Sequence, residues 1–326
     1  MNLYPLVFRP IFKERVWGGA KLKQFYNKSL PSAGPIGESW EISDRPGDVS
    51  IIDNGPLTGK DLHWLVQHHA QEVIGESSLQ NGRFPLLIKI LDCQQKLSLQ
   101  VHPPPAQAKK LGGEPKTEMW YIADAAPNAE LYVGLKRGVT PDEFQQKLQA
   151  GTVSDCFHRI KVRAGDAMFL PSGRVHAIGA GLLIFEVQQN SDTTYRVFDW
   201  NRVGLDGKPR ALHLDESLAS IDFNDFEPPL ISSKAEQADG VTSQQLVDDP
   251  LFKVELLSAA NGKQISFDDA KLRILGVIKG HLLVSGGAGA EQLSPGHFCL
   301  IPAGVPSAQL SFDNATTLLK VEPGDQ

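Results

Sequence analysis

The sequence contains little cysteine, three residues in 326, and an odd number leaves at least one of them unpaired. This count argues against a disulfide-stapled secreted protein and favours the reducing cytoplasm. No stretch reaches 18 consecutive apolar residues, so we expect no transmembrane helix and no membrane partner. The N-terminal segment has neither an uninterrupted apolar region nor a small-residue cleavage site, and we predict no signal peptide.

An excess of one charge sign is also missing. The chain has 32 basic and 38 acidic residues, a formal net charge of −6, and the mixed signs argue against a nucleic-acid partner. At about 150 residues per domain, the length predicts two domains. A chain this long buries roughly three quarters of its unfolded surface, so it can fold without disulfides or a metal. The oligomeric state stays open, a monomer included.

Glycine and proline are plentiful, with 30 and 22 residues, and they divide the chain into short segments. Most segments are apolar or alternating runs of four to eight residues, rich in Val, Ile, Leu and aromatics, which is typical of strands. Turn residues recur about every 8 to 12 positions, and this favours a β-sandwich or barrel over βαβ units. The expected strands include 85–91, 96–101, 118–124, 129–135, 166–171, 182–189 and two within 274–286.

Helices are few. Thr140 and Glu143 form a capping box with Pro141 at the first helical position, and Gly151 ends that helix. Further helices are predicted at 59–75 and 103–113. The histidines of the 59–75 segment, His63, His68 and His69, fit a solvated helix face better than a metal site. The polar, acidic stretch 222–240 contains two adjacent prolines and predicts a surface linker to a C-terminal domain.

An internal repeat relates two parts of the chain. Residues 165–176 and 296–307 share the frame Gly, five residues, Pro, one residue, Gly, two residues, and then a final position. The frame predicts a turn, a buried strand and a Pro-x-Gly corner that turns the next side chains inward. The final position is His176 in the first copy and Ser307 in the second, so only the first copy ends in a residue that can bind a metal.

Four residues form a candidate metal site. Gln100 and His102 are two apart in a predicted strand and point to one face. Glu118 opens an aromatic strand, and His176 follows the Pro-x-Gly corner. Two histidines and one glutamate are a known catalytic Zn²⁺ ligand set that leaves a position open for water or substrate. The net charge of +1 suits the polarisation of a carbonyl or hydroxyl.

These motifs resemble a known family. The repeat resembles the second cupin motif, and the whole set resembles the type I mannose-6-phosphate isomerases (phosphomannose isomerases), particularly the short bacterial form. Thr117 departs from the pattern, because many members carry proline there, and the C-terminal part is similar only in its degenerate cupin frame. The matching segments are GGxxL near Trp17, 37–43, 84–91, 97–103, 116–121, 170–179 and 189–202.

The resemblance implies a fold and a reaction. The fold is mainly β: a catalytic cupin domain over 1–230 with helical insertions and a degenerate C-terminal cupin over 231–326, both jelly-roll barrels with a few short helices. The reaction is the interconversion of mannose 6-phosphate and fructose 6-phosphate, so a sugar phosphate is the expected partner. One Zn²⁺ per chain is implied, with four ligands: Gln100, His102, Glu118 and His176. Arg196 matches the family's active-site arginine, and three further residues match the polar pocket lining: Asp192, Lys116 and Lys89.

Aldose–ketose isomerisation explains the need for these groups. A proton moves between C2 and C1 through an enediol, and negative charge develops on the sugar oxygens. Arg196 can donate to those oxygens. Lys116 lies two residues from Glu118 on the same strand face, and a nearby metal would lower its pKa and make neutral lysine a candidate base. Three candidates could seat the phosphate: Lys89, Arg196 and Arg202.

Two questions stay open in the sequence. The first is the segment 37–43, an alternating strand expected to direct Glu38, Ser39 or Glu41 outward, while Trp17 and Trp40 fit packing better than a pocket wall. The second is the chemistry. A two-His-one-carboxylate site also serves Fe(II) oxygenases, and a protein of this architecture could bind a sugar phosphate without converting it.

Overall fold

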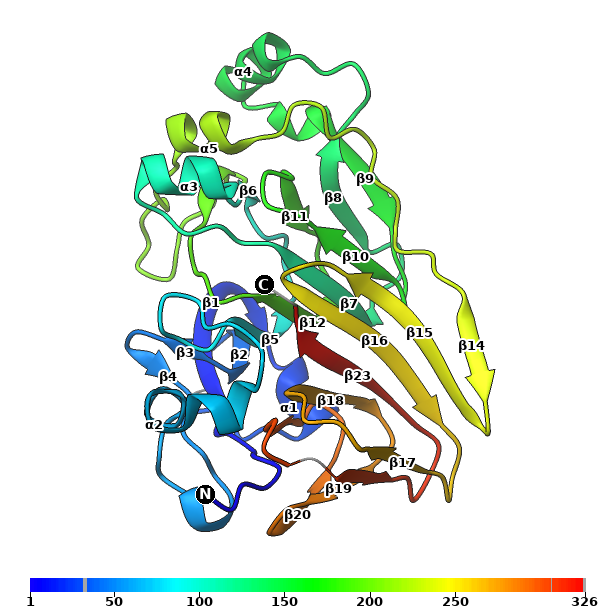
Figure 1. The fold of residues 1–326 in the computed structure, drawn as a ribbon. Helices are drawn as coiled ribbons and strands as arrows, with labels where there is room; N and C mark the ends of the chain where they lie inside the picture. The colour runs from blue at the N-terminus through cyan, green and yellow to red at the C-terminus, as the bar shows by residue number, and fades with distance from the viewer. Residues whose placement is uncertain (32–33, 306, 325–326) are drawn as a thin grey trace.

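Strands form most of the regular structure in the computed structural model, which describes residues 1–31, 34–305 and 307–324. Four main sheets arise from two halves of the chain, and no sheet of the described residues mixes strands from both halves. Figure 1 shows part of the first half above the second half, while the N-terminal elements of the first half lie beside the second half. The mainly β prediction is therefore confirmed.

The first half contains a six-stranded antiparallel sheet in the order β1-β2-β5-β12-β7-β10 and a five-stranded sheet in the order β13-β6-β11-β8-β9. A separate hairpin pairs β3 (Asp44–Arg45) with β4 (Asp48–Val49). The strands of the larger sheet are β1 (Ile11–Gly19), β2 (Ile36–Ile42), β5 (Leu86–Cys93), β7 (Glu118–Ala125), β10 (Ala167–Leu170) and β12 (Leu182–Gln189). Those of the smaller sheet are β6 (Leu99–Val101), β8 (Glu130–Leu135), β9 (Phe157–Lys161), β11 (His176–Ile178) and β13 (Tyr195–Phe198).

The second half repeats this arrangement with sheets in the orders β14-β15-β16-β23-β18-β21 and β17-β22-β19-β20. The strands of its larger sheet are β14 (Ala235–Ala238), β15 (Val241–Asp248), β16 (Phe252–Ala259), β18 (Arg273–Lys279), β21 (Phe298–Ile301) and β23 (Thr316–Pro323). Those of the smaller sheet are β17 (Gln264–Phe267), β19 (Leu282–Gly286), β20 (Gly289–Leu293) and β22 (Ala308–Ser311).

The sequence repeat coincides with this structural repeat. Its strand is β10 in the first copy and β21 in the second, and each forms the edge of a six-stranded sheet, paired with β7 and β18 respectively. The two copies therefore hold equivalent places, as the shared frame predicts.

The prediction of two barrels is not confirmed. Within the described ranges no strand ladder joins a larger sheet to the smaller sheet that faces it, so each half is an open two-sheet sandwich and no barrel closes. The chain passes from one sheet to the other through irregular corners. The backbone hydrogen bonds at these corners are not part of the strand pairing in either sheet. At the corner after β10, Gly173 has φ of +95° and donates its N–H to the carbonyl of His102.

The predicted helices are present. The Thr140 hydroxyl accepts from the Glu143 N–H at 3.2 Å, as the capping box requires, and Asp61 caps α2 in the same way. His68 is exposed, and His63 and His69 are partly so. The helices are α1 (Lys21–Tyr26), α2 (Leu62–Ile74), α3 (Pro105–Leu111), α4 (Pro141–Gln149) and α5 (Leu214–Ser220), with short 3-10 turns at Gly55–Leu57 and Val153–Cys156.

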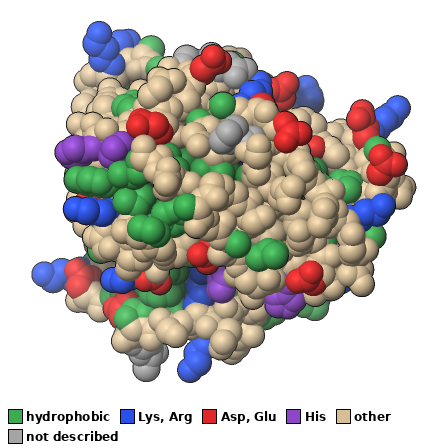
Figure 2. All heavy atoms as spheres, turned by 60° about the horizontal axis from the view of Figure 1, so that its bottom comes forward, with side chains coloured by type: hydrophobic (Ala, Val, Ile, Leu, Met, Phe, Trp, Pro, Cys, Tyr) green, Lys and Arg blue, Asp and Glu red, His purple; other side chains and the backbone are tan. Residues whose placement is uncertain are grey.

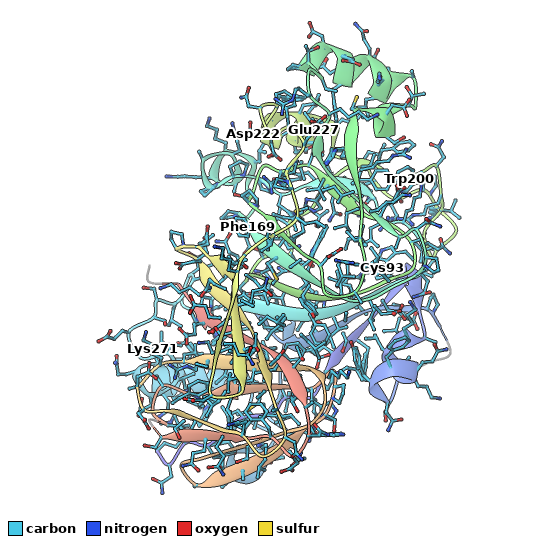
Figure 3. All side chains as sticks on the ribbon, turned by 90° about the vertical axis from the view of Figure 1, so that its right-hand side faces the viewer. Cys93, Phe169, Trp200, Asp222, Glu227 and Lys271 are labelled. Atoms are coloured by element: carbon cyan, nitrogen blue, oxygen red, sulfur yellow. The ribbon has the colours of Figure 1, made fainter. Side chains whose placement is uncertain are left out.

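One hydrophobic core spans both halves. Phe169 of β10 packs edge-on against Phe252 of β16, with ring centroids 6.3 Å apart, and Figure 3 shows Phe169 where the halves meet. Leu6 exchanges two backbone hydrogen bonds with Leu300, so the N-terminal segment is fastened to the second half. The domain boundary at residue 230 stays a prediction.

The stretch predicted as a surface linker is bound to the first half over its initial part. The Leu135 N–H donates to the Asp225 carbonyl, and the Ile231 N–H donates to the Ala167 carbonyl. Figure 3 shows Asp222 and Glu227 on this segment. The composition concealed this because scattered apolar residues, among them Leu230 and Ile231, pack on the cores. Its last part is the exposed edge strand β14.

The surface agrees with the charge count. Figure 2 shows acidic and basic side chains interspersed over one face, with neither sign forming a continuous patch. No helix of the described residues combines the length and hydropathy that a membrane span needs.

Candidate metal and active site

A row of side chains crosses the five-stranded sheet of the first half. Gln100 on β6 pairs with His176 on β11 to one side and with Arg196 on β13 to the other. His102 directly follows β6 and is buried. Pairing between adjacent strands therefore brings together four residues that lie up to 96 positions apart in the chain.

The six-stranded sheet supplies a second row. Lys89 on β5 pairs with Glu186 on β12, which pairs with Trp120 on β7. Glu118 opens β7 two residues before Trp120, on the same face. Gln100, Arg196, Lys89 and Glu186 all line one cavity of about 590 Å³, so the two rows face each other across it.

Three side chains form a compact donor cluster. The Glu118 carboxylate lies 3.4 Å from His176 Nε2 through Oε1 and 3.6 Å from His102 Nε2 through Oε2. Donor atoms from all three residues lie within 4.8 Å of one another, and all three residues are buried. Tetrahedral ligands held about 2.0–2.2 Å from a zinc ion lie roughly 3.4 Å apart, which matches the two carboxylate–imidazole distances.

Backbone contacts set the tautomers of both imidazoles. His102 Nδ1 lies 2.8 Å from the Thr193 carbonyl, and His176 Nδ1 lies 2.9 Å from the Arg174 carbonyl. Because a carbonyl can only accept, Nδ1 carries the proton in each ring and Nε2 keeps its lone pair for a ligand. Burial lowers the pKa of both residues, that of His102 to about 4 with a further contribution from Lys116, so both rings are neutral at pH 7.

The Glu118 carboxylate is ionised, and its partner of opposite charge is the Lys116 ammonium. Burial alone would raise its pKa, but the Lys116 ammonium, 2.5 Å from Oε2, and the two imidazoles hold the pKa well below its usual range. A buried carboxylate is costly unless cations compensate its charge. The neutral imidazoles and the ionised carboxylate beside them fit a divalent metal.

Gln100 stands beside the cluster. Its amide nitrogen lies 3.3 Å from His176 Nε2, while its oxygen accepts from the Ser98 hydroxyl at 3.3 Å. A half turn of the amide would direct the oxygen to the cluster, because the two amide ends have the same shape. The side chain is therefore placed to be the predicted fourth ligand.

The neighbouring carboxylates dominate the electrostatic setting of Lys116. Burial would lower its pKa, but the charges of Glu118 and Glu186 outweigh burial and hold the pKa above its ordinary value. Its ammonium also lies 3.3 Å from His102 Nε2. In this arrangement Lys116 is a proton donor among the metal-binding groups.

Lys89 is neither at a sheet edge nor extended toward solvent. β5 lies between β2 and β12, and the buried Lys89 ammonium is 3.2 Å from Glu186 Oε2 and 5.1 Å from the centre of the Trp40 ring. Glu186 was missed in the sequence, although it stands as a lone charge in an apolar strand, the same signal that marks Lys89. Its other oxygen accepts from the Trp120 indole N–H at 3.0 Å.

The segment 37–43 corrects another expectation, because Glu38, Ser39 and Glu41 are all buried. The alternation does not reveal this, since β2 lies between β1 and β5 and both of its faces are covered. Glu38 faces the cavity with Arg15, whose Nε donates to Oε1 at 2.7 Å, and Glu41 pairs with Lys28.

The two tryptophans of this region differ. Trp17 packs in a core cluster and also lines the cavity. Trp40 is buried, and its indole N–H donates to Glu38 Oε2 at 2.6 Å. The Lys89 ammonium lies over its ring.

The three polar candidates that follow β12 are Asp192, Arg196 and Arg202, and they differ in their relation to the cavity. Arg196 and the exposed Asp192 line the cavity. Arg196 Nε is buried and has no hydrogen-bond partner. Arg202 does not belong to the cavity wall: its guanidinium binds Asp199 and the Lys96 carbonyl, so it is corrected as a phosphate candidate. Arg210, which no sequence motif marked, lines the cavity instead.

The mainly β fold and the His–Glu–His cluster between its sheets define a cupin-like protein with a candidate metal site. A family model for the catalytic domain of type I phosphomannose isomerase matches residues 6–146. The chain is 36% identical over 315 residues to mannose-6-phosphate isomerase ManA of Bacillus subtilis (strain 168), covering 95% of this chain and 96% of that one. It is 34% identical over 310 residues to the mannose-6-phosphate isomerase of Streptococcus mutans, with coverage of 95% and 96%.

Solved structures agree. The crystal structure of the mannose 6-phosphate isomerase from Bacillus subtilis superposes with a TM-score of 0.89 at 33% identity, covering 98% of this chain and 100% of that chain. A mannose 6-phosphate isomerase bound with zinc and yttrium shares the fold, with a TM-score of 0.74 at 17% identity and coverage of 98% and 99%. The chain belongs to the type I phosphomannose isomerase family, and it is an isomerase.

Proposed function

We propose that this protein interconverts mannose 6-phosphate and fructose 6-phosphate through an enediol, with one Zn²⁺ held by His102, Glu118, His176 and Gln100. The observation that carries the proposal is the buried donor cluster at a cavity lined by cationic side chains: two neutral imidazoles whose unprotonated Nε2 atoms lie beside an ionised carboxylate. The relatives named mannose-6-phosphate isomerase support the substrate, and the zinc-bound structure of the same fold supports the metal.

The bound zinc would supply Lewis-acid polarisation of the sugar oxygens at C1 and C2. The chain's own groups must then move the proton between these carbons. Two groups on the cavity wall can hold it: the Lys116 ammonium and the Glu186 carboxylate. Once Glu118 is engaged as a ligand, the charge that raises the pKa of Lys116 is compensated, which favours neutral lysine as the base.

Arg196 is the cation on the cavity wall that is best placed to bind an anion. Each of four other wall cations has a carboxylate partner within 4 Å: Arg15 with Glu38, Lys89 with Glu186, Lys116 with Glu118 and Arg210 with Asp199. Arg196 lines the cavity with no carboxylate ion pair among the described residues, so its guanidinium can donate to the developing enediolate or to the phosphate. Lys89 and Asp192 would contact the sugar from the opposite row and the rim.

One experiment tests this proposal. The purified protein is assayed for conversion of mannose 6-phosphate to fructose 6-phosphate in a coupled assay, before and after treatment with a chelator and after Zn²⁺ is restored. We expect turnover, its loss with the metal and its return with zinc. Turnover that survives complete metal removal would contradict the zinc role.

The same preparation distinguishes the two alternatives. Bound iron with O₂ consumption on an organic substrate would replace the proposal with oxygenase chemistry. Tight sugar-phosphate binding without isomerisation would replace it with a binding protein. The three cysteines are free and buried, which supports the reducing cytoplasm as the place of action.

A further inference from the structure

Arg196 is held by the segment that follows its strand. Its backbone N–H lies 3.2 Å from His213 Nδ1, and its carbonyl accepts from the His213 N–H at 2.9 Å. The guanidinium itself donates from Nη1 to the Ala211 carbonyl at 2.7 Å. The direction of the Arg196 side chain therefore depends on the position of residues 211–213.

These residues end an irregular loop, 199–213, between β13 and α5. The loop is mostly exposed: Val203 and Leu205 retain 49% and 57% of their accessible surface. Its start is fastened by Trp200, whose indole N–H donates to the Leu97 carbonyl at 2.7 Å, and Figure 3 shows Trp200 at the outer side of the first half. Few apolar contacts hold the rest of the loop, so hydrogen bonds and ion pairs determine where the part that leads to α5 lies.

Asp199 anchors this last part of the loop. Its carboxylate accepts from Arg210 Nε at 2.7 Å through Oδ2 and from Arg210 Nη2 at 2.5 Å through Oδ1. Arg202 Nε donates to Oδ1 at 2.9 Å. Asp199 is buried, with 5% of its surface exposed, and a two-point carboxylate–guanidinium contact fixes orientation as well as distance. Arg210 directly precedes Ala211, so the contact also fixes the carbonyl that receives Arg196.

We propose that Asp199 is a positioning residue for the isomerisation, and this inference rests on the proposed function. By clamping Arg210, Asp199 sets the Ala211 carbonyl, which holds Arg196 Nη1 and so orients the Arg196 guanidinium in the cavity wall. The clamp also keeps Gly204, Leu205, Asp206 and Arg210 in the cavity wall.

A double-mutant cycle tests the coupling between Asp199 and Arg196. D199N, R196A and the double variant are assayed for kcat and KM, and their metal content is measured. We expect D199N to lower kcat/KM about 10- to 100-fold with unchanged metal content, since a small displacement of a positioned group has effects of this size. In the R196A background D199N should change kcat/KM less than about twofold, because its effect passes through Arg196. Equal losses in both backgrounds, or no loss in D199N, would overturn the inference.

Two further variants separate positioning from general destabilisation. D269N removes a more exposed carboxylate–guanidinium contact in the second half, where Asp269 Oδ1 lies 2.5 Å from Arg273 Nη2, and it should leave kcat and KM unchanged. D199E keeps the charge on a longer side chain and should recover part of the lost kcat/KM. If D199N does not fold, D199E carries the cycle with R196A, and an additive loss there contradicts the proposal.

Failure of the proposed function would be recognised separately. If the wild-type protein does not isomerise the sugar phosphates, that function fails by itself. The Asp199 inference is then judged by calorimetric titration of the same variants with inorganic phosphate. D199N should weaken phosphate binding in the protein that retains Arg196 and not in the R196A background. Equal weakening in both backgrounds would overturn the Asp199 inference.

Discussion

The Glu118 carboxylate and the His176 imidazole meet with 3.4 Å between Oε1 and Nε2, although they come from strands of different sheets. Glu118 opens β7 of the six-stranded sheet, and His176 opens β11 of the five-stranded sheet. The metal-binding cluster therefore lies between the sheets of the first half, and it forms only when both sheets pack.

The second half shows how the same framework loses this cluster. Glu118 pairs with Leu170, directly before the proline of the first repeat, and Arg273 pairs with Ile301 at the equivalent place in the second. A guanidinium group does not coordinate a metal ion, and Arg273 instead forms ion pairs with Asp269 and Glu322. With Ser307 at the place of His176, two of the three donors are absent from the second copy.

Removal of a metal donor should abolish both metal binding and turnover. E118A and H176A each take one ligand from a buried cluster, so we expect metal content near zero and at least a 1,000-fold loss of kcat/KM, measured by elemental analysis and the coupled assay. H68A, at an exposed position of α2, serves as the control and should retain both. Full isomerase turnover in a metal-free variant would contradict the assignment.

Removal of the Arg196 guanidinium should separate turnover from metal binding. Arg196 is not a donor to the cluster, so R196A should keep a full metal content while kcat falls about 100- to 1,000-fold, the effect of losing a preorganised donor to a developing negative charge. R196K, which retains the charge without the two-point donor geometry, should fall between the two proteins. A wild-type kcat in R196A would refute this role.

Lys116 should also be needed for turnover and not for metal retention. K116M keeps most of the side-chain volume and removes the proton-carrying group, so kcat should fall about 100- to 10,000-fold, as for a lost acid–base group. The metal should remain, because the three donors are intact. If K116M retains wild-type kcat with an unchanged pH profile, Glu186 becomes the base, and E186Q should then show the loss instead.

Glu38 should contribute to stability in mild acid. Burial alone would raise its pKa, but Lys89 and Arg15 lower it to about 2, from 4.5. A carboxyl with a lowered folded-state pKa contributes stability above its unfolded pKa and loses it as the pH falls through the folded pKa. The contribution is about 3 kcal/mol at neutral pH. The difference in unfolding free energy between wild type and E38Q, measured in urea, should shrink as the pH falls from 5 toward 2; a difference independent of pH would contradict it.

Much of the fold could be predicted because local interactions produce it. The Thr140 cap and Pro141 define the start of α4 through bonds within four residues, and short apolar runs bounded by turn residues identify β5, β7 and β12. The repeat frame carried enough information to place β10 and β21 at equivalent edges. Closure of the sheets could not be predicted this way, because it depends on ladders between distant strands.

In the candidate site, too, some features could be predicted from the sequence and others depended on the tertiary structure. Residue type, spacing and the repeat proposed Gln100, His102, Glu118 and His176, and the family resemblance implied the same set. The structure brings His102, Glu118 and His176 together. Only the tertiary structure decided that Glu38 and Glu41 are buried, that Arg202 turns to Asp199 and that Arg210 lines the cavity. The physical reason is that alternation reports the two faces of a strand, whereas burial and ion pairing depend on which distant strand or loop covers each face.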